Sequence, residues 1–368
     1  MDACTTPSAS ALLMLTALCA ALAGRDPEPV RRLLESGSID WLALQVAADH
    51  HRLTGYLSAL LHAPGWQWFV PAEFLTHAQR IYLQQWVRNG QLLREMERIA
   101  GRLEASGVPC LFFKGPLLAA ALYDQLGSRA SHDIDVLIPH AKDIARFEPA
   151  LASLGYSRRS RLILPLVISQ HGLYQLEYCS DTFVVEPHWS LQRHPSLRID
   201  TERIWRQGVT RTTPGGALPA LSDEYTLLAN ILSIPADLQN ASLKLRTIFE
   251  LHLLCRRFPA EYDWAAFWER RRLERTGRLA SVALAVAADL FGARDAPLRL
   301  PLSEETRSLA NHVRAQVLSQ GTSEWRRRRL AFQLFEAPLP LSMLWWSVTL
   351  PMRAMAHPEV TSSRLRRW

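Results

Sequence analysis

The sequence predicts an α/β (α+β) protein in which a small mixed sheet lies between N-terminal and C-terminal helical regions. Apolar residues recur three and four positions apart over long stretches on both sides of the centre, as they do in amphipathic helices. Between these stretches, short apolar runs alternate with helical patterns, and two later runs form a hairpin pattern. Hydrophobic residues make up 48% and charged residues 21% of the 368 residues, which is typical of a folded chain with a sizeable core.

These patterns divide the chain into three regions. The N-terminal helical region covers residues 1–106 and is followed by the turn Gly107-Val108-Pro109. The core covers residues 107–200, and the C-terminal helical region covers residues 201–368. There is no internal repeat or low-complexity tract, so we expect a compact centre of about a hundred residues between helical flanks.

The core begins with a strand–helix–strand pattern. The run "CLFFKG", which starts at Cys110, predicts a buried strand, and "PLLAAALYDQL" predicts a helix with Pro116 in its first turn, where proline is tolerated. The run "DIDVLI", which starts at Asp133, predicts the next strand. The following "AKDIARFEPALASLGY" predicts an amphipathic helix that stops at Gly155.

A hairpin and further helices follow. The runs "LYQLEY" and "TFVVEPHW" alternate apolar and polar residues, and Cys179-Ser180-Asp181 joins them as a turn. Beyond Ser222 the helical spacing returns in "EYTLLANILSI", "KLRTIFELHLLCRRF" and "DWAAFWERRRLERTG". The hairpin therefore adds strands to the sheet of the core, and the helices after it form the C-terminal flank.

The charge balance is mildly basic. The formal net charge is +7, which weakly favours anionic partners such as nucleotides or nucleic acid. Much of this charge is the run from Arg326 to Arg329, and such runs are usually solvated helix faces. Aromatic and basic residues do not alternate around the run, so nucleic acid is an unlikely partner on this sequence.

Cysteines and apolar segments bear on the location of the protein. The five cysteines are scattered and form no Cys-x-x-Cys pair, which argues against a disulfide framework or zinc site and favours the cytoplasm. The segment from Ala11 to Gly24 resembles a signal peptide, but only Asp2 is charged before it, so we expect a buried first helix. The segment from Ala337 to Met352 is short and interrupted by prolines, so no transmembrane segment is expected.

Two aspartates stand out in the second predicted strand. Side chains alternate along a strand, so Asp133 and Asp135 share one face. Two carboxylates this close repel each other, and a cation that prefers oxygen ligands, Mg²⁺ or Mn²⁺, would compensate them. The alternative is a strand end whose acids are solvated or paired with Arg129 or His132.

The hairpin supplies a third acid. Alternation in "TFVVEPHW" places Glu186 and His188 on one face. Three acids on adjacent strands can hold two divalent ions, which would clamp a transferring phosphoryl group. The alternatives are a sheet-edge acid for Glu186 and a structural histidine for His188.

A phosphate-binding turn precedes the acids. Gly115 ends a strand and opens a helix, so its backbone can approach a phosphate while the helix N-terminus offers free N–H groups. Lys114 could reach a triphosphate oxygen or one of the acids. The turn, the aspartate pair and the third acid are more specific together than any of them alone.

These residues resemble a known family. The segments "FFKGPLLAAALYDQLGSRASHDIDVLI", "LASLGY" and "VVEPHWSL" are similar to the uncharacterised nucleotidyltransferase family of the DNA polymerase beta-like superfamily, and the resemblance spans roughly residues 10 to 355. It implies that Gly115 occupies the position of the superfamily's glycine signature, and that Asp133, Asp135 and Glu186 are the acidic residues that bind the metal. Arg129 matches an arginine four positions ahead of the first aspartate of the family.

The chain departs from the superfamily pattern at two points. The usual Gly-Ser is Gly115-Pro116 here, which removes one N–H group and a hydroxyl from the phosphate cradle. The tripeptide Gly127-Ser128-Arg129 resembles the Gly-Ser-Arg of minimal nucleotidyltransferases, but it lies too close to Asp133 to leave room for the intervening helix. We therefore expect Gly115 to be the cradle and Arg129 to enter the strand or contact a phosphate.

Residues and resemblance together predict a metal-dependent nucleotidyltransferase with Mg²⁺ or Mn²⁺ as cofactor. It would move a nucleoside monophosphate from a triphosphate such as ATP to an unknown acceptor hydroxyl or phosphate on a small molecule, peptide or protein. The catalytic and metal-binding residues would be Asp133, Asp135 and Glu186, and the nucleotide-binding residues Lys114, Gly115, Arg129 and His188. The alternatives are an inactive nucleotide-binding or scaffold module and an antitoxin-like or antibiotic-modifying nucleotidyltransferase.

Overall fold

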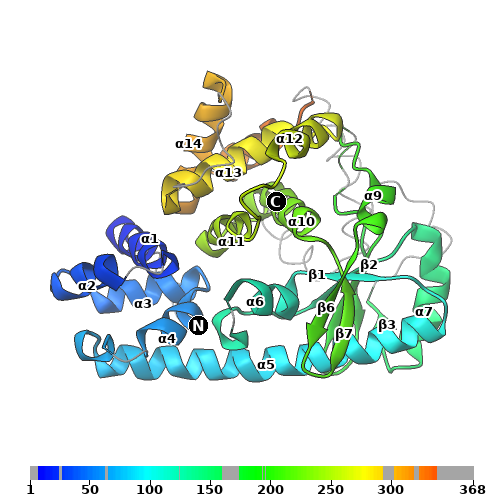
Figure 1. Cartoon of the computed structure of the whole chain (residues 1–368), viewed down its shortest axis with the longest axis horizontal. Helices are drawn as coiled ribbons and strands as arrows, with labels where there is room; N and C mark the ends of the chain where they lie inside the picture. The colour runs from blue at the N-terminus through cyan, green and yellow to red at the C-terminus, as the bar shows by residue number, and fades with distance from the viewer. Residues whose placement is uncertain are drawn as a thin grey trace. The chain divides into compact units, whose positions relative to one another are not determined.

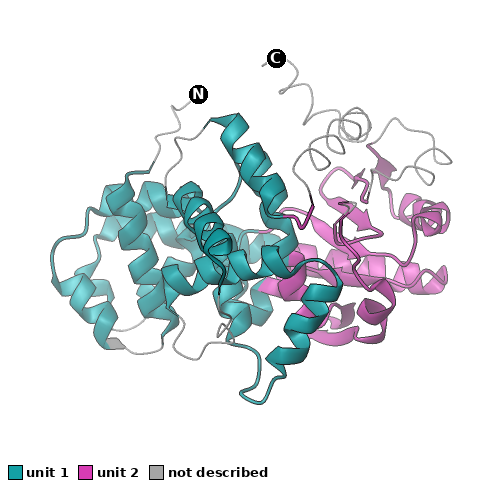
Figure 2. Ribbon diagram, turned by 90° about the horizontal axis from the view of Figure 1, so that it is seen from above, with its two compact units in different colours: residues 1–89, 119–130, 230–334 teal, residues 90–118, 131–229, 335–368 magenta. Residues whose placement is uncertain are grey.

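The structure, a computed structural model whose helices and strands are labelled in Figure 1, divides into two compact units, which Figure 2 shows in different colours. Unit 1 comprises residues 1–89, 119–130 and 230–334, and unit 2 comprises residues 90–118, 131–229 and 335–368. This grouping follows proximity in space, whereas the three regions expected from the sequence follow chain order and stay a prediction. The structure describes residues 7–24, 27–62, 65–123, 125–159, 174–192, 194, 196–292, 302–318 and 323–337.

Unit 2 contains a seven-stranded mixed sheet with the strand order β3-β4-β5-β2-β1-β7-β6. The pairs β2–β5 and β1–β7 are parallel, and the other neighbours are antiparallel. The predicted α+β fold with a mixed sheet is therefore confirmed. The strands are β1 Leu111–Phe113, β2 Ile134–Leu137, β3 Ser157–Arg158, β4 Tyr178–Cys179, β5 Val184–His188, β6 Val209–Thr213 and β7 Gly216–Ala220.

The predicted hairpin is present, and a second one extends the sheet. Strands β4 and β5 pair antiparallel around the expected turn, with Tyr178 opposite Val185. Strands β6 and β7 form a hairpin that the sequence analysis did not predict. Its signal was the threonine-rich "VTRTT" followed by Pro-Gly-Gly, which is a strand followed by a turn. Because β7 pairs with β1, this hairpin is part of the same sheet as the acids.

Helices accompany the sheet of unit 2. Helix α7 ends at Ala152, three residues earlier than expected, and the chain then turns through Gly155, whose φ of 88° is easily adopted by glycine. Asp200 caps α9 by accepting a hydrogen bond from the backbone N–H of Arg203. The elements within unit 2 are η3 Ala141–Asp143, α7 Ile144–Ala152 and α9 Thr201–Arg206; the unit boundaries fall within α5 Ala72–Ala105, α6 Gly115–Tyr123 and α10 Asp223–Gln239.

Unit 1 is helical in the part that the structure describes. The first helix, α1, buries Leu12, Leu15, Leu18 and Cys19 along one stripe, which confirms the predicted buried first helix. It packs against α3 and α13. The elements within unit 1 are α1 Ala9–Ala23, α2 Pro27–Glu35, α3 Trp41–His50, α4 Thr54–Leu61, η1 Gln67–Phe69, η2 Leu126–Ser128, α11 Leu245–Cys255, α12 Trp264–Leu273, α13 Gly277–Phe291, α14 Glu304–Leu318 and α15 Glu324–Gln333.

The remaining expectations concern membranes and charge. Among the helices in the described ranges, none combines the length and apolar character needed to cross a membrane. The segment from Ala337 to Met352 lies almost wholly outside the described residues. The basic run lies on α15, where Arg328 pairs with Glu324 and the Arg329 guanidinium lies 5.4 Å from the centre of the Trp325 ring. Arg326 and Arg329 are exposed, as expected of a solvated face.

Close packing explains the Gly127-Ser128 pair in unit 1. A Cβ atom on Gly127 would lie 2.5 Å from the ring of Tyr82, and one on Gly55 would lie 2.3 Å from the carbonyl oxygen of Gly127. Both distances are too short for any side chain, so α4 and η2 approach each other through two glycines. The glycine at position 127 therefore has a packing role that does not depend on phosphate binding.

A buried histidine in unit 1 makes stability depend on pH. The His51 side chain is 0% exposed, and its Nδ1 accepts a hydrogen bond of 2.9 Å from the backbone N–H of Leu245. Burial, reinforced by His50 and Lys244, lowers the pKa of His51 to about 3. The unfolded chain therefore takes up a proton at His51 below its ordinary pKa of 6.5, and the folded chain does not.

We expect the free energy of unfolding to fall by about 2 kcal/mol from this group between pH 7 and pH 5, at about 1.4 kcal/mol per unit below the ordinary pKa. Urea unfolding at several pH values, compared between wild type and His51→Gln, measures this contribution. The variant should show a shallower dependence, while His312→Gln, at an exposed position on α14, should keep the wild-type slope. Equal slopes in wild type and His51→Gln would contradict the assignment.

Candidate active site

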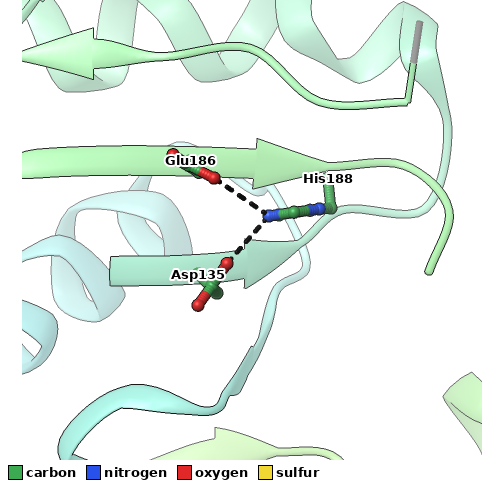
Figure 3. A group of neighbouring side chains, drawn as sticks. All are labelled: Asp135, Glu186 and His188. Carbon is green, nitrogen blue, oxygen red and sulfur yellow. Dashed lines mark hydrogen bonds and ion pairs between the residues drawn. The ribbon is translucent and has the colours of Figure 1, made fainter. Parts of the chain in front are cut away.

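The register of two parallel strands brings two of the three predicted acids, Asp135 and Glu186, together in unit 2. Strand β2 pairs with β5 so that Asp135 lies beside Glu186 and Leu137 lies beside His188. Because side chains alternate along each strand, Asp135, Glu186 and His188 lie on one face of the sheet. Figure 3 shows the three side chains converging from the two strands.

The three side chains form a tight group. His188 Nε2 lies 3.0 Å from Asp135 Oδ1 and 3.7 Å from Glu186 Oε2. One ligand atom from each residue falls within 4.8 Å of the others, which is close enough for all three to contact a single ion. Asp135 and His188 are buried, at 7% and 4% exposure, and Glu186 is half-buried. The sequence placed Glu186 with the aspartates but assigned His188 to nucleotide binding.

Gln175 was missed by the sequence reasoning. Its Nε2 donates a hydrogen bond of 2.8 Å to Glu186 Oε2, and its backbone bridges to His188. The sequence did contain a signal, because Leu176 and Tyr178 are the apolar positions of "LYQLEY" and leave Gln175 on the opposite, polar face. Gln175 thus holds the Glu186 carboxylate in its orientation toward the group.

The neighbouring charges of the acid cluster shift the pKa of Glu186. Burial raises the pKa of Glu186 well above its ordinary value, and the charges of Asp135 and Asp133 raise it further. Lys114 lowers it, so the ammonium group acts on the same carboxylate. Asp133 lies one residue before β2 and is half-buried. It belongs to the cluster through its charge, while the group of close ligand atoms consists of Asp135, Glu186 and His188.

The turn from β1 to α6 is strained and lies against the acids. Lys114 has a φ of 60°, which an L-residue other than glycine adopts at a cost, and Gly115 follows with a φ of 50°. A Cβ atom on Gly115 would lie 3.5 Å from the carbonyl oxygen of Asp133, so the turn contacts the start of β2. The predicted cradle and the predicted acids are therefore neighbours.

Phe113 links Lys114 to His188. Its ring centre lies 5.4 Å from Lys114 Nζ and 5.1 Å from the ring centre of His188, in an edge-to-face arrangement. Tyr174 lies on His188 as well, with the ring centres 5.9 Å apart. These aromatic contacts fix the plane of the imidazole, and the sequence reasoning assigned no role to either aromatic residue.

Arg129 makes a buried ion pair within unit 1. Its Nε donates a hydrogen bond of 2.8 Å to Glu250 Oε1, and the two side chains are 7% and 2% exposed. Arg246 lies 3.4 Å from the same carboxylate and donates to the carbonyl oxygen of Ala130. This pairing gives Arg129 a structural role, and its predicted contact with a nucleotide stays a prediction.

Comparison with known proteins agrees with this arrangement. Residues 37–292 match a family model described as an uncharacterised nucleotidyltransferase. The chain belongs to this nucleotidyltransferase family. The match includes the Lys114–Gly115 turn, Asp133, Asp135, Glu186 and His188, and it confirms the resemblance inferred from the sequence. No curated protein matches the chain.

The site of this nucleotidyltransferase family member fits a divalent cation. Two carboxylates and an imidazole nitrogen lie within reach of one ion, and this donor set suits small divalent metals. Burial is the main cause of the raised pKa of Glu186, the charges of Asp135 and Asp133 raise it further, and a cation would relieve the repulsion between these acids. Nucleotidyltransferases usually use such ions, so the residues present are consistent with the chemistry of the family.

Proposed function

We propose that this protein transfers a nucleoside monophosphate from a nucleoside triphosphate to an acceptor hydroxyl or phosphate, releasing pyrophosphate. The observation that carries the proposal is the side-by-side placement of Asp135 and Glu186 on β2 and β5 in a chain of a nucleotidyltransferase family. A nucleotide-binding protein without catalysis does not require several carboxylates converging on one another at an energetic cost.

The residues of the site have different roles in the proposed transfer. Asp133, Asp135 and Glu186 would hold Mg²⁺ or Mn²⁺. A bound divalent cation supplies electrostatic stabilisation of the charge that develops on the phosphoryl oxygens. An acceptor oxygen forms a bond to the α-phosphorus while the bond to the β-phosphate oxygen breaks. Glu186, whose pKa is raised, is suited to take the proton of the acceptor.

Lys114 and Gly115 are suited to the triphosphate. The N-terminus of α6 and the Lys114 ammonium offer positive partial and full charge next to the acids. The strained backbone of Lys114 supports this assignment, because strain of this kind concentrates at functional sites. His188, which contacts Asp135, orients the carboxylate that faces the triphosphate.

The test incubates purified protein with each labelled nucleoside triphosphate, Mg²⁺ or Mn²⁺, and cell extract, and measures pyrophosphate release and label transfer. Metal-dependent pyrophosphate release with label on an extract component supports the proposal, and the labelled product identifies the acceptor class. A labelled antibiotic or protein would distinguish an antibiotic-modifying from an antitoxin-like enzyme. Binding of triphosphate without any turnover would instead support the inactive nucleotide-binding module.

Two variants of Lys114 test its roles in triphosphate binding and in stability separately. We expect Lys114→Ala and Lys114→Gly to raise the KM for the triphosphate more than they lower kcat, because both remove the ammonium group. Lys114→Gly should be more stable than Lys114→Ala by about 1 kcal/mol, since glycine adopts a positive φ without the cost that alanine has. Steady-state kinetics and urea unfolding of both variants measure the two effects. Unchanged KM in both variants would contradict a role for Lys114 in binding.

A further inference from the structure

We propose that His188 is itself a metal ligand, so that this site binds divalent cations of the transition series such as Mn²⁺ in preference to Mg²⁺. The inference rests on the proposed function, in which the acid cluster holds a cation, and adds the identity of a ligand and of the preferred ion. On the sequence alone, the expected metal ligands were only the carboxylate oxygens of Asp133, Asp135 and Glu186.

The position of His188 carries the inference. Its Nε2 is directed at two carboxylates at once, 3.0 Å from Asp135 Oδ1 and 3.7 Å from Glu186 Oε2 (Figure 3). The three ligand atoms therefore surround one small volume. The rings of Phe113 and Tyr174 hold the imidazole in this orientation, so Nε2 is preorganised toward that volume.

The surroundings of Glu186 resemble those of a metal-bound carboxylate. Carboxylates that ligate metals are usually oriented by an outer hydrogen bond, and Gln175 provides one at 2.8 Å. The charges of Asp135 and Asp133 act on the same Glu186 carboxylate and raise its pKa further than burial alone, while Lys114 lowers it.

The chemistry of the donor set determines the preferred ion. Mg²⁺ favours oxygen ligands and retains water, whereas imidazole nitrogen suits transition metals. Mn²⁺ accepts both carboxylate and imidazole ligands. A site with two carboxylates and one imidazole nitrogen therefore favours Mn²⁺ over Mg²⁺, and the preference depends on His188.

Mn²⁺ is the probe for the test, because it is paramagnetic and reports the nuclei bound to it. Pulsed electron paramagnetic resonance of the full chain with Mn²⁺ should show modulation from a ¹⁴N nucleus, and protein labelled with ¹⁵N-histidine should show the ¹⁵N pattern instead. His188→Gln should lose this modulation and bind Mn²⁺ at least about tenfold more weakly. Its affinity for Mg²⁺, measured by competition, should change little.

Substitutions of two other histidines show which histidine supplies the nitrogen that binds Mn²⁺. His132→Gln, next to Asp133, and His140→Gln, at the other end of β2, should both keep the modulation. Loss of the signal in His132→Gln, or Mn²⁺ bound to wild type without histidine modulation, would overturn the inference and leave His188 as a hydrogen-bond donor to Asp135. Absence of Mn²⁺ binding by wild type would overturn it as well. Should His188→Gln fail to fold, the isotope comparison and the other two variants still decide the outcome.

The inference and the proposed function fail in different ways. Pyrophosphate release with Mg²⁺ and no nitrogen signal with Mn²⁺ would retain nucleotidyl transfer and remove His188 as a ligand. A nitrogen signal from His188 without turnover of any triphosphate would retain the metal site and remove the transferase.

Discussion

Asp135→Asn protein is expected to lose pyrophosphate release by roughly a thousandfold or more, which corresponds to about 4 kcal/mol of transition-state stabilisation. Asparagine keeps the size of the side chain and an oxygen that accepts from His188, but it removes the charge that would hold the cation. The free energy of unfolding should stay the same or rise, because the charge of Asp135 no longer opposes that of Glu186. Glu186→Gln should act in the same direction on turnover.

The measurement compares metal-dependent pyrophosphate release at equal concentrations of folded protein. Asp181→Asn is a matched control, because Asp181 lies exposed in the turn between β4 and β5 and undergoes the same chemical change. It should retain wild-type turnover and stability. Turnover of Asp135→Asn at the wild-type rate would eliminate the metal–acid mechanism and favour the scaffold interpretation.

Glu250→Gln is expected to lower the free energy of unfolding by about 3–5 kcal/mol, the largest effect on stability that we predict. Burial alone would raise the pKa of Glu250, but Arg129 and Arg246 overcome this and hold the pKa below its ordinary value. Glu250 is thus ionised and is the carboxylate that both arginines contact. Its neutralisation leaves two guanidinium groups buried with less compensation.

The control is the same substitution in an exposed ion pair of unit 1. Glu269 pairs with Arg272 on the surface of α12, where both side chains are more than half exposed, so Glu269→Gln should change stability far less than Glu250→Gln does. Arg129→Met extends the test to the predicted nucleotide contact. If it alters stability with an unchanged KM for the triphosphate, Arg129 is structural, whereas a raised KM at normal stability would support nucleotide binding.

Alternation along strands was enough to predict that the acids share a face. Asp135 and Glu186 each follow from a period of two within a short apolar run, and Gly115 follows from a strand that ends where a helix begins. These are local patterns. The register that sets Asp135 beside Glu186 is not local, because nothing in either strand specifies its neighbour across the sheet.

The contacts and strands that the sequence did not predict depend on distant partners or on exposed residues. Arg129 is paired with Glu250, which lies 121 positions away, so its burial had no signature near the Asp-x-Asp motif. The role of His188 as a neighbour of Asp135 depends on the same parallel pairing. The hairpin of β6 and β7 was overlooked because its residues are largely exposed and carry little apolar alternation.

The parallel pairing of β2 with β5 also determines when the site can form during synthesis. Asp135 and His188 are 53 residues apart, so ribosomal elongation separates them by roughly 3 to 10 seconds. The antiparallel pair of β1 and β2 can close first, because only residues 114–133 lie between its strands. Parallel pairing between distant segments raises the contact order and slows folding.

A nascent chain therefore presents the β2 edge for seconds before β5 can cover it. Strand β7, whose Ala220 pairs with Phe112, emerges later still and covers the β1 edge. During this interval the acids are not yet gathered, so the emerging chain holds no assembled chelating group. We expect any fragment that ends before His188 to lack the proposed metal site and to leave the edges of its central strands exposed to association with other chains.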